Sequence, residues 1–170
     1  MPQKKKKLLI SVINVLLVFV VVIIQYTPLL SMKIGTATPM IALAALIAIS
    51  MFCSELTASL AGMILGIFTD TSSSTSFGFN SIVFFAIAFL TSFFIHYLFN
   101  NNFRSAIALG IILSALYFIV RWLFFFSFGH SINDSFTYLF QYALPSIIYT
   151  TVITLIFYLF EKLLFKKIIK

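Results

Sequence analysis

The sequence predicts an all-α integral membrane protein that folds as a bundle of six transmembrane helices. The chain has 170 residues, of which 62% are hydrophobic and only 9% are charged, whereas soluble domains carry roughly 25% charged residues. The hydrophobic residues are gathered into runs about as long as a bilayer-spanning helix, which needs roughly 20 residues. Most of the 11 Lys and Arg residues lie at the two termini, a pattern typical of cytoplasmic ends and of contacts with anionic lipid.

The first helix is predicted from about Leu8 to Tyr26, behind the basic start MPQKKKK. We interpret it as a transmembrane helix and not as a signal peptide, because no small-residue cleavage site follows it before Pro28. After a loop that carries Lys33, a second helix is expected to start at Thr38-Pro39. Threonine is a favoured N-cap, and proline fits the first helical position.

The number of spans follows from the charges. The apolar run from Met40 to Phe68 has about 29 residues, or about 44 Å as one helix. The positive-inside rule places both lysine-rich termini in the cytoplasm, so the number of spans must be even. This run must therefore divide in two at Ser54-Glu55. The predicted single polytopic domain, residues 1–170, then has spans at about 8–26, 39–53, 55–69, 78–99, 105–128 and 136–160.

Three features of the later spans are also predicted. Asn100 to Asn102 should form a cytoplasmic turn, and Gly129 to Asp134 should form an outer loop. Pro145 should kink the last span near Gln141 to Leu144, because proline lacks a backbone N–H and disturbs the preceding turn. The tail from Glu161 to Lys170 should continue this helix to the inner surface, with its lysines snorkelling to the interface.

Residues capable of catalysis are few. His96 and His130 lie far apart in the predicted topology, and Cys53 is the single cysteine. The sequence contains no metalloprotease, nucleophile-elbow, phosphate-loop or CxxC motif. We therefore expect no enzymatic activity, no cofactor and no metal site. The net charge of +7 resides mostly at the termini, so we expect lipid contacts and no nucleic-acid binding.

Charged residues inside the predicted membrane region indicate a functional or structural site more strongly than the histidines and the cysteine do, because charges are costly there and usually paired. Asp70 and Arg121 should lie at similar depth near the outer face, on the third and fifth spans. They mark either a partner or ligand site, or an ion pair or simple snorkelling that ties the two helices together, and we favour the second interpretation. Glu55 and His96 are both expected near the inner face, and the same alternatives apply to this pair.

Two glycines on the third predicted span are four residues apart. Gly62 and Gly66 therefore share one helix face and allow a second helix to approach closely. That helix belongs either to this chain or to a partner protein. We favour packing within the chain.

The same stretch resembles the central signature of the MreD family, the rod shape-determining membrane proteins of bacteria. The residues that carry the resemblance are Glu55, Leu56, Ala58, Gly62, Gly66, Asp70, Gly78 and Asn80. Two positions depart from the pattern: Ser54 stands in place of a glycine, and Phe77 in place of a leucine. The match covers about 26 residues, and the rest of the chain is similar in hydropathy alone.

The resemblance implies a non-catalytic scaffold subunit of the elongasome, which controls cell shape through lateral peptidoglycan synthesis. The implied partners are an MreC-like protein and, through it, MreB, RodA and a class B penicillin-binding protein. The implied location is the bacterial cytoplasmic membrane, with both termini in the cytoplasm. Candidate partner or helix-packing residues are Glu55, Gly62, Gly66, Asp70, Gly78, Asn80 and Arg121.

The resemblance also supplies an alternative. MreD proteins are similar in fold to the substrate-binding S components of energy-coupling factor (ECF) vitamin transporters, so a vitamin-binding S component is the second hypothesis. S components usually carry an alanine motif in the first helix for docking to the transporter scaffold. The first predicted helix here, SVINVLLVFVVVIIQY, contains no alanine, which favours the MreD interpretation.

Overall fold

The structure, a computed structural model, describes residues 3–27, 38–72, 78–125 and 139–169. Within these ranges the chain is helical and contains no strand, which confirms the all-α prediction. The helices are α1 (Gln3–Tyr26), α2 (Ile41–Ser50), α3 (Glu55–Ser72), α4 (Phe79–Tyr97), α5 (Phe103–Phe125), a π-helical turn η1 (Leu139–Ala143) and α7 (Leu144–Ile169).

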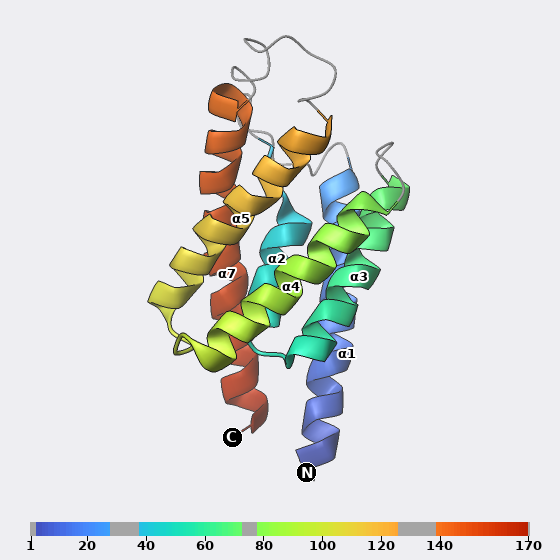
Figure 1. Cartoon of the computed structure of the whole chain (residues 1–170). Coiled ribbons are helices and arrows are strands. Elements are labelled where there is room, and N and C mark those ends of the chain that lie inside the picture. Colours follow the sequence, from blue (N-terminus) through green and yellow to red (C-terminus); the bar gives the residue numbers. More distant parts are fainter. Residues whose placement is uncertain (1–2, 28–37, 73–77, 126–138, 170) are drawn as a thin grey trace.

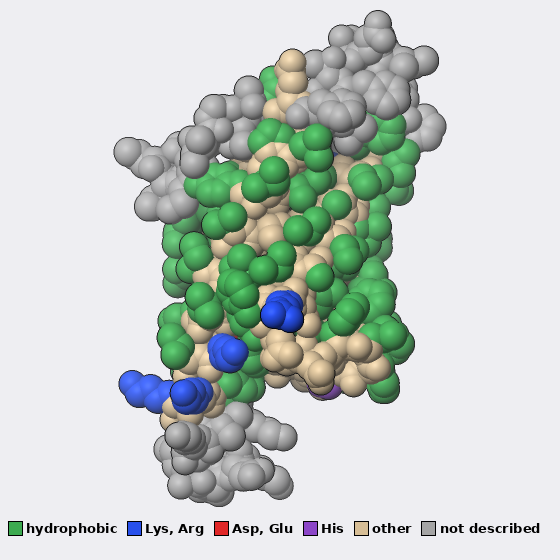
Figure 2. Space-filling view, turned by 90° about the vertical axis from the view of Figure 1, so that its left-hand side faces the viewer, with side chains coloured by type: hydrophobic (Ala, Val, Ile, Leu, Met, Phe, Trp, Pro, Cys, Tyr) green, Lys and Arg blue, Asp and Glu red, His purple; other side chains and the backbone are tan. Residues whose placement is uncertain are grey.

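The helices run alternately up and down, and the N- and C-termini lie at the same end of the bundle (Figure 1). The link between α2 and α3 and the turn between α4 and α5 also lie at this end. Basic side chains gather there on the face that Figure 2 shows, below a surface that is mainly apolar. Arg104, Lys162, Lys166 and Lys167 are exposed. Both termini therefore lie at one end of the bundle, as expected for a chain with two cytoplasmic termini.

Three segments are long and apolar enough to cross a membrane: α4, residues Phe103–Phe124 of α5, and Gln141–Lys167 across η1 and α7. Val12–Tyr26 of α1 and the whole of α2 are shorter apolar helices. With ten residues, α2 is about 15 Å long, half of the roughly 30 Å hydrocarbon core. The predicted span at 39–53 is therefore too long, and the described residues establish three candidate spans and not six.

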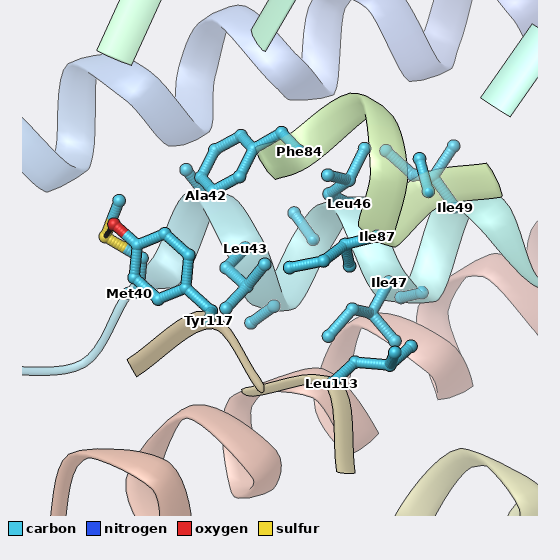
Figure 3. Packing of buried hydrophobic residues seen from close by; sticks show 14 of the residues in the cluster. Met40, Ala42, Leu43, Leu46, Ile47, Ile49, Phe84, Ile87, Leu113 and Tyr117 are labelled. Carbon is cyan, nitrogen blue, oxygen red and sulfur yellow. Dashed lines mark hydrogen bonds between the residues drawn. The ribbon is translucent and has the colours of Figure 1, made fainter. Parts of the chain in front are cut away.

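Helix α2 forms the centre of the bundle. All ten of its residues are buried, and it packs against α1, α3, α4, α5 and α7. Figure 3 shows Leu43, Leu46 and Ile47 of α2 beside Phe84 and Ile87 of α4. Four alanines in the sequence IALAALIAIS let neighbouring backbones come close, as small residues do in membrane proteins.

The predicted start of the second helix at Thr38-Pro39 is wrong. The helix begins after Met40, which has no side-chain cap. Its first amides bond to distant residues instead: Met40 N–H donates to Thr150 Oγ1 (3.2 Å), and Ala42 N–H donates to Gln25 Oε1 (2.7 Å). A helix that starts inside the bundle still needs acceptors for its free amides, and here α1 and α7 provide them.

A π-helical turn lies where the last span was predicted to kink before Pro145. The π-helical turn Leu139–Ala143 directly precedes α7, and Pro145 is the second residue of that helix. Proline cannot donate a backbone hydrogen bond to the preceding turn, and π turns are one way in which helices absorb such a change.

Several predictions concern residues outside the described ranges. They are the loop that carries Lys33, most of the run from Thr71 to Ser76, and the loop from Gly129 to Asp134 with His130. The side chains of Lys4 to Lys7 also lie outside the described part.

Candidate functional site

The glycines of α3 lie against the backbone of α4. A Cβ atom added at Gly62 would lie 2.5 Å from the carbonyl oxygen of Phe84, and one added at Gly66 would lie 2.3 Å from Ser81 Cα. Both separations are far shorter than a van der Waals contact, so no larger residue fits without moving α4. The two glycines therefore pack two helices of the same chain, as predicted, and this face of α3 is already occupied.

Asp70 caps the start of α4. It is 3% exposed and lies near the end of α3, across the inter-helix segment. Its Oδ1 accepts from the Asn80 N–H (3.0 Å) and Nδ2 (2.8 Å), and its Oδ2 accepts from the Gly78 N–H (3.1 Å), the Ser81 N–H (3.1 Å) and the Ser81 Oγ (2.8 Å). A carboxylate at this position both pairs the free amides and complements the positive end of the helix dipole.

Gly78 permits this cap. Its φ of +96° lies in the left-handed region, which glycine adopts without the steric penalty of a side chain. The left-handed turn aims the N–H groups of Gly78, Asn80 and Ser81 at the same carboxylate. Gly78 and Asn80 are thus explained by their place in the cap.

A polar chain continues from the cap to α5. The Tyr117 hydroxyl, fully buried, donates to Asn80 Oδ1 (2.9 Å). One helical turn along α5, Arg121 Nη1 donates to the Tyr117 hydroxyl (3.4 Å). Hydrogen bonds in such a chain polarise one another. Asp70 and Arg121 are therefore connected through two intervening side chains, Asn80 and Tyr117.

The predicted ion pair between Asp70 and Arg121 is not formed. Among the described residues, no ion pair joins these two side chains. Asp70 bonds instead to Gly78 and to the first residues of α4. Thr71 and Ser72 bond back to carbonyls of α3 through their hydroxyls.

Glu55 and His96 meet at the opposite end of the α3–α4 pair. His96 Nδ1 lies 3.2 Å from Glu55 Oε1, with the His96 side chain 46% exposed and that of Glu55 29% exposed. His96 Nδ1 also lies 2.9 Å from the carbonyl oxygen of Ser92, whose hydroxyl donates to the Cys53 carbonyl (2.6 Å). These bonds tie the α2–α3 link to α4.

The α3–α4 hairpin therefore brings together six of the seven site candidates: Glu55, Gly62, Gly66, Asp70, Gly78 and Asn80. The seventh, Arg121, joins it through Tyr117. Tyr117 was missed by the sequence reasoning. Its one local signal is its spacing of four residues from Arg121, which places both on one helix face.

This arrangement fixes helices relative to one another. The oxygens of Asp70 accept five hydrogen bonds, so the carboxylate is committed to donors within the chain. Such a fully bonded network rigidifies a buried region. Comparison with protein-family models, curated proteins and solved structures found no match for this chain.

Proposed function

We propose that this chain is an MreD-like, non-catalytic scaffold subunit of the bacterial cell-elongation complex. The observation that carries the proposal is that the residues of the sequence resemblance act as one unit. Gly62 and Gly66 set the closeness of α3 and α4, and Asp70, Gly78 and Asn80 fix where α4 begins. The spacing of the signature thus has a physical reason in the hairpin, which supports the resemblance.

We further propose an S-component-like bundle in the cytoplasmic membrane, with the termini in the cytoplasm. The common end of the two termini (Figure 1) and the exposed basic residues there, Arg104, Lys162, Lys166 and Lys167, support this orientation by the positive-inside rule. In this proposal the hairpin is a rigid element of the scaffold. An MreC-like protein is the proposed direct partner, with MreB, RodA and a class B penicillin-binding protein reached through it.

Depletion in the rod-shaped or ovoid bacterium that encodes the protein tests this function. Loss of the protein should round or swell the cells and disturb lateral wall synthesis, without creating a vitamin requirement. Wild-type protein expressed in trans should restore the shape. Gly66→Ala, which forces α3 and α4 apart, should restore it less well at equal membrane abundance, while the matched change Gly110→Ala should succeed.

Two other outcomes would contradict the proposed function. Depleted cells of normal shape that cannot take up a vitamin would exclude the elongation role and favour the S-component hypothesis. Normal shape and normal vitamin uptake together would reject both functions.

A further inference from the structure

Glu161 is a carboxylate enclosed within the bundle. It lies on α7 and is 0% exposed, whereas the lysine that follows it, Lys162, is exposed. Neither of its carboxylate oxygens has a hydrogen-bond partner. The tail continues the last helix, since α7 runs to Ile169, but the Glu161 side chain faces the interior. Buried carboxylates are normally paired or neutralised, so Glu161 requires an explanation.

Two other side chains, Asn14 and Asn101, also carry buried unpartnered acceptors. Cys53, on the α2–α3 link, lies near Asn14, Thr57 and Glu161. Asn14 on α1 is 7% exposed, and its Oδ1 has no partner. Asn101 Oδ1 is also unpartnered, while its Nδ2 donates to the carbonyl of Met51 on the same link (2.8 Å).

These unpartnered atoms share one chemical property. Within the described ranges, the buried side-chain atoms that lack a hydrogen bond are all acceptor oxygens, belonging to Asn14, Asn101 and Glu161. A set composed only of acceptors is completed by a donor or by a cation. A partner protein cannot supply it without opening the bundle, because Glu161 is fully enclosed. The group must be small.

The available side chains also limit which kind of cation could bind. The described residues contain no group of three His, Cys, Asp or Glu side chains that could hold a metal ion, so a transition-metal site lacks its usual ligands. A single carboxylate suits a hard cation of single charge. Oxygen ligands of this kind are those that hard cations prefer.

We propose that Glu161 holds a monovalent cation, either a proton or Na⁺, inside the bundle. Binding neutralises the enclosed carboxylate and thereby stabilises the folded bundle. Cys53 on the α2–α3 link lies near Glu161, and Tyr158 and Lys162 lie within one helical turn of it on α7. The Lys162 ammonium lies 5.6 Å from the centre of the Tyr158 ring. This inference does not depend on the proposed function.

Thermal unfolding of the purified full chain tests the proposal. The melting temperature is followed in detergent micelles with NaCl or choline chloride at constant ionic strength, under mildly acidic and mildly alkaline conditions. If Na⁺ is the ligand, the temperature should rise by about 3 to 6 °C for each tenfold increase of Na⁺ above its dissociation constant. If a proton is the ligand, the temperature should rise on acidification without regard to Na⁺.

Two variants locate the response. Glu161→Gln removes the charge with little change in shape, so it should abolish the dependence on Na⁺ or on pH. The matched control Glu55→Gln makes the same change in the partly exposed partner of His96 and should retain the dependence. Equal responses of wild type and Glu161→Gln would overturn the proposal.

Infrared spectroscopy of the wild-type protein distinguishes the two cations and does not require a folded variant. A protonated carboxyl band that disappears on alkalinisation assigns a proton. A carboxylate band that shifts on exchange of choline for Na⁺ assigns sodium. If neither band change occurs and the melting temperature ignores both cations, Glu161 binds no cation.

Discussion

Replacing Gly66 with alanine tests the contact between α3 and α4. The added Cβ would lie 2.3 Å from Ser81 Cα and 2.6 Å from Ser81 N, whereas ordinary contacts begin at 3.4 Å. Helix α4 must therefore move by about 1.1 Å at this point, the difference between 3.4 and 2.3 Å. This movement stretches the bond from the Ser81 N–H to Asp70, now 3.1 Å, beyond hydrogen-bonding range.

The expected loss of stability has two parts. Overpacking costs about 1 to 3 kcal/mol, and loss of one capping bond costs about 1 kcal/mol. Together they lower the free energy of unfolding by about 2 to 4 kcal/mol, which corresponds to about 4 to 16 °C in melting temperature for a chain of this size. Melting in detergent micelles, followed by fluorescence, measures this change.

Gly110→Ala is the matched control. The Cβ added there meets the methyl group of Thr151 at 3.1 Å, a side-chain contact and not a backbone one. Alanine also has the higher helix propensity, so this variant should lose less than about 1 kcal/mol. If the melting temperature of Gly66→Ala equalled that of the wild type, or was no lower than that of Gly110→Ala, the close approach of α3 and α4 would be refuted.

Three further predictions follow from the polar chain and the helix order. Tyr117→Phe removes the hydrogen bond to Asn80 and should destabilise the protein by about 1 kcal/mol; an unchanged melting temperature would mean that this bond contributes nothing. Asp70→Asn and Arg121→Gln should couple by about 0.5 kcal/mol or more in a double-mutant cycle, because Asn80 and Tyr117 connect the two side chains in one hydrogen-bond chain; strict additivity would mean that this chain transmits no interaction. Reporter fusions at the C-terminus and in the turn between α4 and α5 should both report the cytoplasm, whereas a fusion in the segment between α3 and α4 should report the outside; a cytoplasmic signal from that segment would contradict the topology.

Local patterns in the sequence predict much of the helical structure. Long apolar runs place the helices, and Pro145 marks the interruption that the π-helical turn forms. The four-residue spacing of Gly62 and Gly66 predicts a close helix contact, which α4 makes. These features are predictable because each depends on residues within one or two helical turns.

Features that depend on distant partners could not be predicted. Asp70 and Arg121 lie at the same end of the bundle, yet Asp70 bonds to the amides of α4, ten or so residues away. The first amides of α2 find acceptors on α1 and α7, up to 110 residues away. Glu161 has an ordinary sequence environment between a phenylalanine and a lysine, and nothing local reveals that it is enclosed.

The dependence of α2 on α7 has a consequence for biosynthesis. Thr150, which accepts from the Met40 N–H, and Ser146, which accepts from the Thr38 N–H (3.1 Å), are made long after α2 leaves the ribosome. Until α7 arrives, these amides lack their final acceptors and the apolar surface of α2 lacks one of its covers. Native assembly is therefore a late event, completed after translation of the last helix. A chain truncated before α7 presents an unfinished core to the proteases that remove misassembled membrane proteins.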